Sequence, residues 1–203
     1  GDVVGLLRAY ARDTGTPAAD ELFDKDSSGN ARPEEVVLAT DDTRYVASEW
    51  WGSVDFGDGF RDASGDDVAL SSYTAGAAFR WFRSPGSDAE GAYPRGLAVG
   101  PEGEVYVGAA LFEGSGSESL TGGLVARLDS LGDEQWESRT SPGDARAFIP
   151  ISVALGDESI YLVGSFTGPA SFAGVALESE PSDVDPDTPS QDVALISLDR
   201  ESG

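Results

Sequence analysis

Residues Gly96 to Trp136 read GLAVGPEGEVYVGAALFEGSGSESLTGGLVARLDSLGDEQW, and the fold can be predicted outward from this stretch. Two apolar segments flank the turn residues at 101–104, and a Gly/Ser-rich connection leads to two further segments, the last of which ends in Trp136. Short apolar segments separated by Gly, Pro, Asp and Ser are typical of antiparallel strands joined by tight turns. The stretch therefore predicts four successive antiparallel β-strands.

The same pattern recurs along the chain. Tyr45, Tyr106 and Tyr161 each lie in an apolar segment, with spacings of 61 and 55 residues, and Trp81 and Trp136 are 55 residues apart. An immunoglobulin-like sandwich also has short strands, but not this internal copying. Four strands in each repeat are typical of a propeller blade, which buries its faces only against neighbouring blades. We therefore predict an all-β protein, a β-propeller of four-stranded antiparallel blades, of which about three and a half are present.

The predicted units belong to one partial propeller that spans residues 1–203. They are a half blade at 2–30, complete blades at 31–84 and 92–140, and a blade without its last strand at 148–203. We expect Pro33, Pro94 and Pro150 to precede the first strand of the last three units at matching positions. Because an open propeller exposes sheet edges, further blades from the same chain or from a second copy are expected to cover them.

The repeat motifs resemble those of the bacterial seven-bladed propeller-repeat (SBBP-type) proteins. The similar runs are Gly52-Ser53-Val54-Asp55-Phe56-Gly57, Val163-Gly164-Ser165-Phe166-Thr167-Gly168, Ser171-Phe172-Ala173-Gly174, and Leu124-Val125-Ala126-Arg127-Leu128-Asp129 with Gly132 and Trp136. The resemblance implies an exported or cell-surface protein, and its motifs are structural, so they imply no catalytic residues. The first unit departs from the pattern, since Leu22 and Phe23 stand where a tryptophan is expected.

Composition restricts the possible functions. The net charge is −24, which excludes nucleic acid as a natural partner and makes an anionic membrane surface a poor one, while it favours cations. The chain has no His and no Cys, so Ser-His and Cys-His catalytic pairs, disulfides and the usual zinc sites cannot form. No apolar run is long enough to cross a membrane. An enzyme would have to work with carboxylates, as glycosidases do, so we expect a protein that is not an enzyme.

The sharpest local motif is a candidate calcium loop between the first two units. It has the spacing D-x-D-x-S-G-x5-E, and the candidate ligands are Asp24, Asp26, Ser28, Asn30 and Glu35. The flanking residues favour strands over the usual pair of helices, and the alternative is a solvated Asp/Ser/Gly turn. Calcium is the one cofactor that the sequence suggests.

Two further features are candidate contact sites. Trp50 and Trp51 are adjacent in a strand and should face opposite ways, so one of them could stack on a sugar or contact a partner, while packing between blades is the alternative. The acidic run at 182–187 could attract a cation, and the alternative is a surface loop.

Together these features predict a non-enzymatic, exported or cell-surface module for binding or structural support, stabilised by calcium if the loop binds it. Its partner would be a protein or a glycan at the surface. Two alternatives are a propeller that binds or processes carbohydrate with its carboxylates, and a subunit of an extracellular assembly whose open edges are completed by neighbouring copies. A signal peptide is not expected within this sequence.

Overall fold

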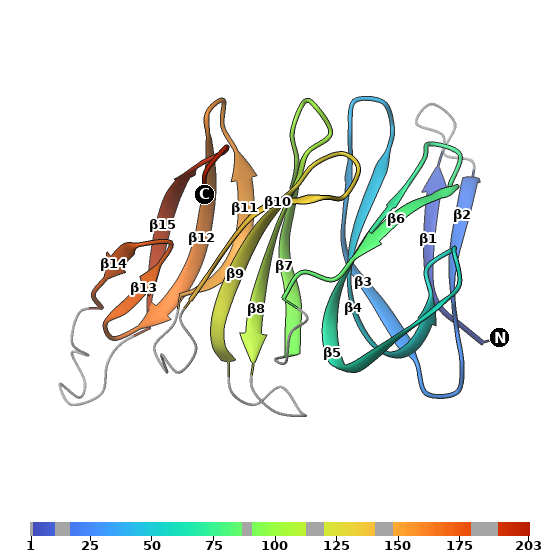
Figure 1. Cartoon of the computed structure of the whole chain (residues 1–203), viewed down its shortest axis with the longest axis horizontal. Helices are drawn as coiled ribbons and strands as arrows, with labels where there is room; N and C mark the ends of the chain where they lie inside the picture. The colour runs from blue at the N-terminus through green and yellow to red at the C-terminus, as the bar shows by residue number, and fades with distance from the viewer. Residues whose placement is uncertain (1, 11–16, 87–90, 113–119, 141–147, 180–190) are drawn as a thin grey trace.

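The computed structural model describes residues 2–10, 17–86, 91–112, 120–140, 148–179 and 191–203, with side chains from Phe23 onward. Every regular element in these ranges is a β-strand, and all strand pairs are antiparallel (Figure 1). The predicted all-β class is therefore confirmed. None of the described segments forms a helix that could cross a membrane.

The first sheet has a four-stranded meander at its centre. Its strands are β3 (Asn30–Leu38), β4 (Arg44–Asp55), β5 (Phe60–Tyr73) and β6 (Phe79–Arg83). A hairpin of β1 (Asp2–Tyr10) and β2 (Pro17–Lys25) joins the far end of β4, where Asp24 pairs with Asp55 and Lys25 with Val54. The predicted half unit is thus hydrogen-bonded to the first sheet.

The second sheet contains the four strands that the opening stretch predicted. They are β7 (Gly91–Val99), β8 (Val105–Phe112), β9 (Leu120–Leu128) and β10 (Glu134–Arg139). Each strand pairs with its neighbour in sequence, in the order β10-β9-β8-β7. The turn before β8 is fixed by the Gly100 amide, which donates to the Glu104 carbonyl at 2.8 Å.

The third sheet has three strands among the described residues. They are β11 (Ile149–Leu155), β12 (Ser159–Thr167) and β15 (Gln191–Asp199), in the order β11-β12-β15. A short separate hairpin, β13 (Ala170–Phe172) and β14 (Val175–Leu177), follows β12. Along its other edge, β15 has no strand partner in the described part of the chain.

The prediction that prolines stand before the first strands is wrong, because each first strand begins earlier. Pro33, Pro94 and Pro150 lie inside β3, β7 and β11, each next to an irregularity in the strand register. These three strands are sheet edges, where a proline's missing N–H costs no ladder hydrogen bond. A bulge at such a place bends the strand and changes the direction of its side chains.

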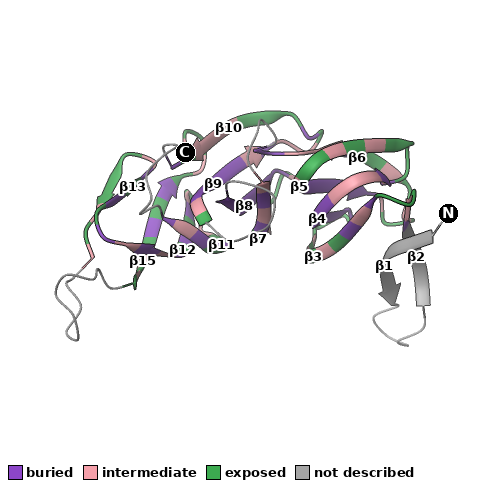
Figure 2. Cartoon of the chain, turned by 90° about the horizontal axis from the view of Figure 1, so that it is seen from below, coloured by how far each residue is buried: buried purple, intermediate pink, exposed green. Residues whose placement is uncertain are grey.

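The sheets stack face to face. In Figure 2 they follow one another, with β3, β7 and β11 along one side of the molecule and β6 and β10 along the opposite side. β7 contacts both β3 and β11. One apolar core, which includes Leu70, Leu97 and Leu124, lies between the first and second sheets, and another, which includes Ile160 and Leu162, lies between the second and third. Burial of one such leucine or isoleucine side chain contributes about 1.5–3 kcal/mol to the free energy of folding, so the stacking of the sheets is a large source of stability.

Candidate functional site

Beside the apolar core, a tryptophan from an outer strand joins the first sheet to the second. The Trp81 indole N–H of β6 donates to the Ser130 carbonyl at 3.1 Å, in the turn between β9 and β10. Gly132 in that turn has φ +83°, and a Cβ on it would be 2.7 Å from Trp81 Cδ2. The ring of Tyr45 lies 5.8 Å from that of Trp81. The indole is therefore held on a turn that has room for it only because residue 132 is glycine.

The same contact occurs between the second and third sheets. The Trp136 indole N–H of β10 donates to the Arg200 carbonyl at 3.1 Å, in the turn that follows β15. Gly203 has φ +80°, and a Cβ on it would be 2.9 Å from Trp136 Cε3. The ring of Tyr106 lies 6.2 Å from that of Trp136, in the place that Tyr45 has beside Trp81. We call these two sets of contacts the tryptophan junctions.

Phe23, which the sequence motifs align with the tryptophans of the later units, makes a different contact. It is fully buried, with its ring 5.3 Å from that of Phe56 and 6.3 Å from that of Tyr73. The Tyr73 hydroxyl donates to the Phe56 carbonyl at 3.0 Å. An aromatic core therefore joins the β1–β2 hairpin to the first sheet.

The candidate calcium loop forms the turn between β2 and β3. The Asp26 carboxylate accepts hydrogen bonds from the Ser28 amide and hydroxyl, both at 2.7 Å, and from the Gly29 amide at 3.0 Å. These bonds, that of the Ser28 hydroxyl first, lower the pKa of Asp26. Gly29 is packed so closely that a Cβ would be 1.9 Å from the Ser53 carbonyl oxygen. The turn therefore has a stable geometry in which Asp26 binds its own backbone.

The remaining candidate ligands are distributed along the two strands. Asp24 accepts a hydrogen bond from the Lys25 amide, Asn30 begins β3, and Glu35 lies within β3 opposite Ala47. Within the described ranges, no three His, Cys, Asp or Glu side chains are grouped so that they could hold a metal ion. Calcium binding here stays a prediction that a titration must test.

The two adjacent tryptophans differ in exposure. Trp50 is 3% exposed and packs edge-on against Phe56 and Phe82, with ring centroids 5.4 Å away in both cases. Trp51 is half-buried. Of the two, Trp51 is the one with surface to offer a sugar or a partner. The acidic run at 182–187 lies outside the described residues.

A polar pocket of about 170 Å³ lies between the first two sheets, where β3 and β4 meet β7. We call it the Glu49 pocket; it is lined by Arg32, Glu34, Glu49, Tyr93, Pro94 and Arg95. Glu49 is 5% exposed, and its Oε2 atom has no hydrogen-bond partner. Burial raises the pKa of Glu49, which the nearby Arg32 and the Tyr93 hydroxyl partly oppose.

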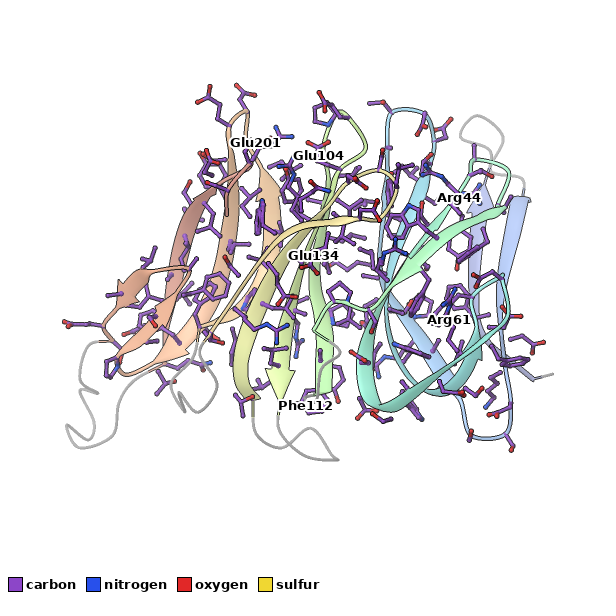
Figure 3. All side chains as sticks on the ribbon, in the orientation of Figure 1. Arg44, Arg61, Glu104, Phe112, Glu134 and Glu201 are labelled. Carbon is purple, nitrogen blue, oxygen red and sulfur yellow. The ribbon has the colours of Figure 1, made fainter. Side chains whose placement is uncertain are left out.

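A larger, acidic pocket of about 440 Å³ lies between the second and third sheets, beside the β7–β8 and β11–β12 turns. Glu104 and Glu201, labelled in Figure 3, both line it. The Arg200 guanidinium pairs with Glu104 and donates to the Asp157 carbonyl at 2.9 Å, while Arg127 pairs with Glu201 at 2.7 Å. Its arginines are thus engaged in holding the third sheet on the second.

Comparison with known proteins gives no family. No family model matches the chain, and no curated protein is significantly similar to it. The resemblance to SBBP-type repeat proteins therefore depends on the sequence motifs alone.

Sequence reasoning did not select Glu49, although a signal was present. Glu49 follows Tyr45 by four residues, and the corresponding positions after Tyr106 and Tyr161 are Ala110 and Ser165. The corresponding residues of the other two strands are small, so the shared fold does not require a carboxylate at this position.

Proposed function

We propose that this chain is a segment of a β-propeller repeat protein, and that it acts as a non-enzymatic module for binding or structural support. In this proposal β3–β6 and β7–β10 are complete blades, β11, β12 and β15 form a blade without its fourth strand, and β1–β2 is the outer half of a preceding blade. The observation that carries the proposal is the recurrence of the tryptophan junction, with the same donor atom, the same kind of acceptor and a left-handed glycine each time.

Stacked sheets of this kind suit a binding function better than catalysis. Each sheet is held by its neighbour, so the turns are presented on a rigid support where residues can vary without loss of the fold. The strong negative charge favours cations and a medium in which salt screens the repulsion. We propose an exported or cell-surface location on the same grounds, with calcium at the β2–β3 turn as a stabilising ligand.

Calcium binding is tested by thermal unfolding in calcium and in chelator. A ligand of the folded state at a hundred times its dissociation constant adds about 2.7 kcal/mol. We expect the melting temperature to rise in calcium for the natural sequence and not for Asp26→Ala. Surface labelling of intact source cells, with permeabilised cells as the control, tests the location, and a signal that appears only after permeabilisation would contradict it.

A second candidate function, a subunit of a larger assembly, is favoured by one face of the third sheet. Tyr161, Val163, Val193 and Leu195 alternate with buried or half-buried residues along β12 and β15, and each is at least 38% exposed. Strands that are apolar on both faces are typical of sheets covered on both sides. The face therefore fits a further sheet, and the edge of β15 that has no strand partner among the described residues fits a further strand.

Molar mass in solution, measured against protein and salt concentration, tests the assembly. Association that grows with salt and is lost in Val193→Ser would support it, since salt screens the net charge. Val36→Ser is a matched control, because Val36 is 49% exposed on β3 of the first sheet. A monomer under all conditions would contradict assembly between copies.

A further inference from the structure

We propose that the Glu49 pocket binds a neutral, hydroxyl-rich ligand, namely a saccharide unit. The pocket lies entirely among β3, β4 and β7, so this binding does not depend on how the third sheet is completed.

The first support is the buried carboxylate of Glu49. Its side chain is 6% exposed; the Tyr93 hydroxyl hydrogen-bonds the carboxylate and the Arg32 Nη2 atom forms an ion pair with Oε2 at 3.5 Å, but Oε2 itself accepts no hydrogen bond. A buried carboxylate with an unmet acceptor is costly unless a donor reaches it. A ligand hydroxyl in the pocket is a donor of the right kind.

The second support is the charge balance, which selects the class of ligand. Arg32 and Arg95 contribute two positive charges, and Glu34 and Glu49 contribute two negative charges. A cation would meet the guanidinium groups and an anion would meet the carboxylates, so neither has a net attraction. A hydroxyl group can donate to a carboxylate and accept from a guanidinium, which makes a polyol the ligand that uses both.

The third support is the rigidity of the frame. The Tyr93 ring is stacked on Phe112 with centroids 4.6 Å apart, and the Glu49 side chain is almost completely buried. The bulges of β3 and β7 lie beside the pocket and set the directions of its side chains. Fixed polar groups bind a small ligand at a lower entropic cost than mobile ones. The volume of about 170 Å³ leaves room for one ring or one end of a saccharide.

The fourth support is that the fold does not need this carboxylate. Ala110 and Ser165 occupy the corresponding positions of β8 and β12, in strands with the same pairing. A charged group kept at a buried position that small residues fill elsewhere is a candidate for function, especially beside a pocket.

Binding is tested by ¹H–¹⁵N correlation spectra of the labelled chain, titrated into the millimolar range. The probes are D-glucose, D-galactose, D-mannose and N-acetyl-D-glucosamine, with calcium chloride and sodium phosphate as charged probes. We expect at least one saccharide to shift the amides of Glu49, Tyr93 and Arg95 saturably, and neither charged probe to do so. Shifts of these amides by calcium or phosphate alone, or no saccharide shift at all, would overturn the proposal.

Variants then assign the site. Glu49→Gln keeps the shape and removes the charge, and Arg95→Ala removes an exposed guanidinium with little effect on folding; each should weaken binding about tenfold or more. Arg83→Ala is the matched control, because Arg83 pairs with Asp133 across the same two sheets but does not line the pocket. If Glu49→Gln does not fold, Arg95→Ala alone decides, and unchanged affinity in that variant refutes the site.

Discussion

The tryptophan junction can be tested by adding one methyl group to Gly132. The residue has φ +83°, where a side chain costs about 1–2 kcal/mol. The new Cβ would lie 2.7 Å from Trp81 Cδ2, 2.9 Å from Cε3 and 3.0 Å from Cε2, closer than van der Waals contact allows. Overpacking of this kind costs a further 1–3 kcal/mol, roughly. We therefore expect Gly132→Ala to lower the free energy of unfolding by about 2–5 kcal/mol.

Gly174→Ala is the matched control. Gly174 has φ +76°, and nothing lies within 4 Å of a Cβ built on it, so it carries the backbone cost without the clash. Both variants lower the entropy of the unfolded chain equally, which cancels in the comparison. Any difference between them therefore measures the contact with Trp81.

The assay is urea unfolding followed by circular dichroism. With a slope of about 2 kcal/mol per M, a clash of 1–3 kcal/mol separates the two midpoints by about 0.5–1.5 M, the Gly132→Ala midpoint being the lower. Equal midpoints would show that the indole does not lie on the turn, and the stacking of the first two sheets as described would be refuted.

Three further outcomes are expected. Trp136→Phe keeps most of the ring but loses the hydrogen bond to Arg200, so its free energy of unfolding should fall by at least about 1 kcal/mol in the same urea assay. Burial raises the pKa of Glu49 above its usual 4.5, so the stability that the protonated side chain contributes is lost as pH rises from about 4.5 through the folded-state pKa. In Glu49→Gln, where Arg32 and Tyr93 still face the site, the melting temperature should fall less over that pH range. Hydrogen bonds hold the pKa of Asp26 below 3.8, so the stability that its carboxylate contributes is present above that pH and is lost as pH falls further. Asp26→Ala should therefore lose less stability on acidification than the natural sequence. Identical loss of stability with acid in the two proteins would contradict the turn geometry.

The sequence predicted the strands well because local chemistry determines them. The turn between Val99 and Val105 and the apolar segments on either side of it predict a hairpin without any tertiary information, and the structure has it. The errors arose where strand ends depend on tertiary contacts. Pro94 was expected before a strand, yet an edge strand tolerates proline at a bulge, so β7 begins at Gly91.

The candidate sites were harder to predict, because exposure and pockets depend on which sheet faces which. Trp50 and Trp51 could be assigned to opposite faces from the strand period, but only the structure shows that Trp50 is the one buried, against Phe56 and Phe82. Glu49 differs from its counterparts in sequence, but the adjacent Tyr93 and Arg95 belong to another sheet. Composition and residue spacing do not show which residues of two different sheets come to lie side by side.

The most direct test of the repeated junction is a nuclear Overhauser measurement on the two tryptophan rings. If Trp81 and Trp136 both rest on the turn of the next sheet, the Hε3 ring proton of each gives a cross-peak to its glycine, Trp81 to the Hα protons of Gly132 and Trp136 to those of Gly203, while each indole N–H stays hydrogen-bonded to a carbonyl. We expect both cross-peaks, with slow exchange of both indole protons. Cross-peaks from neither tryptophan, or from one alone, would contradict a junction that repeats along the chain.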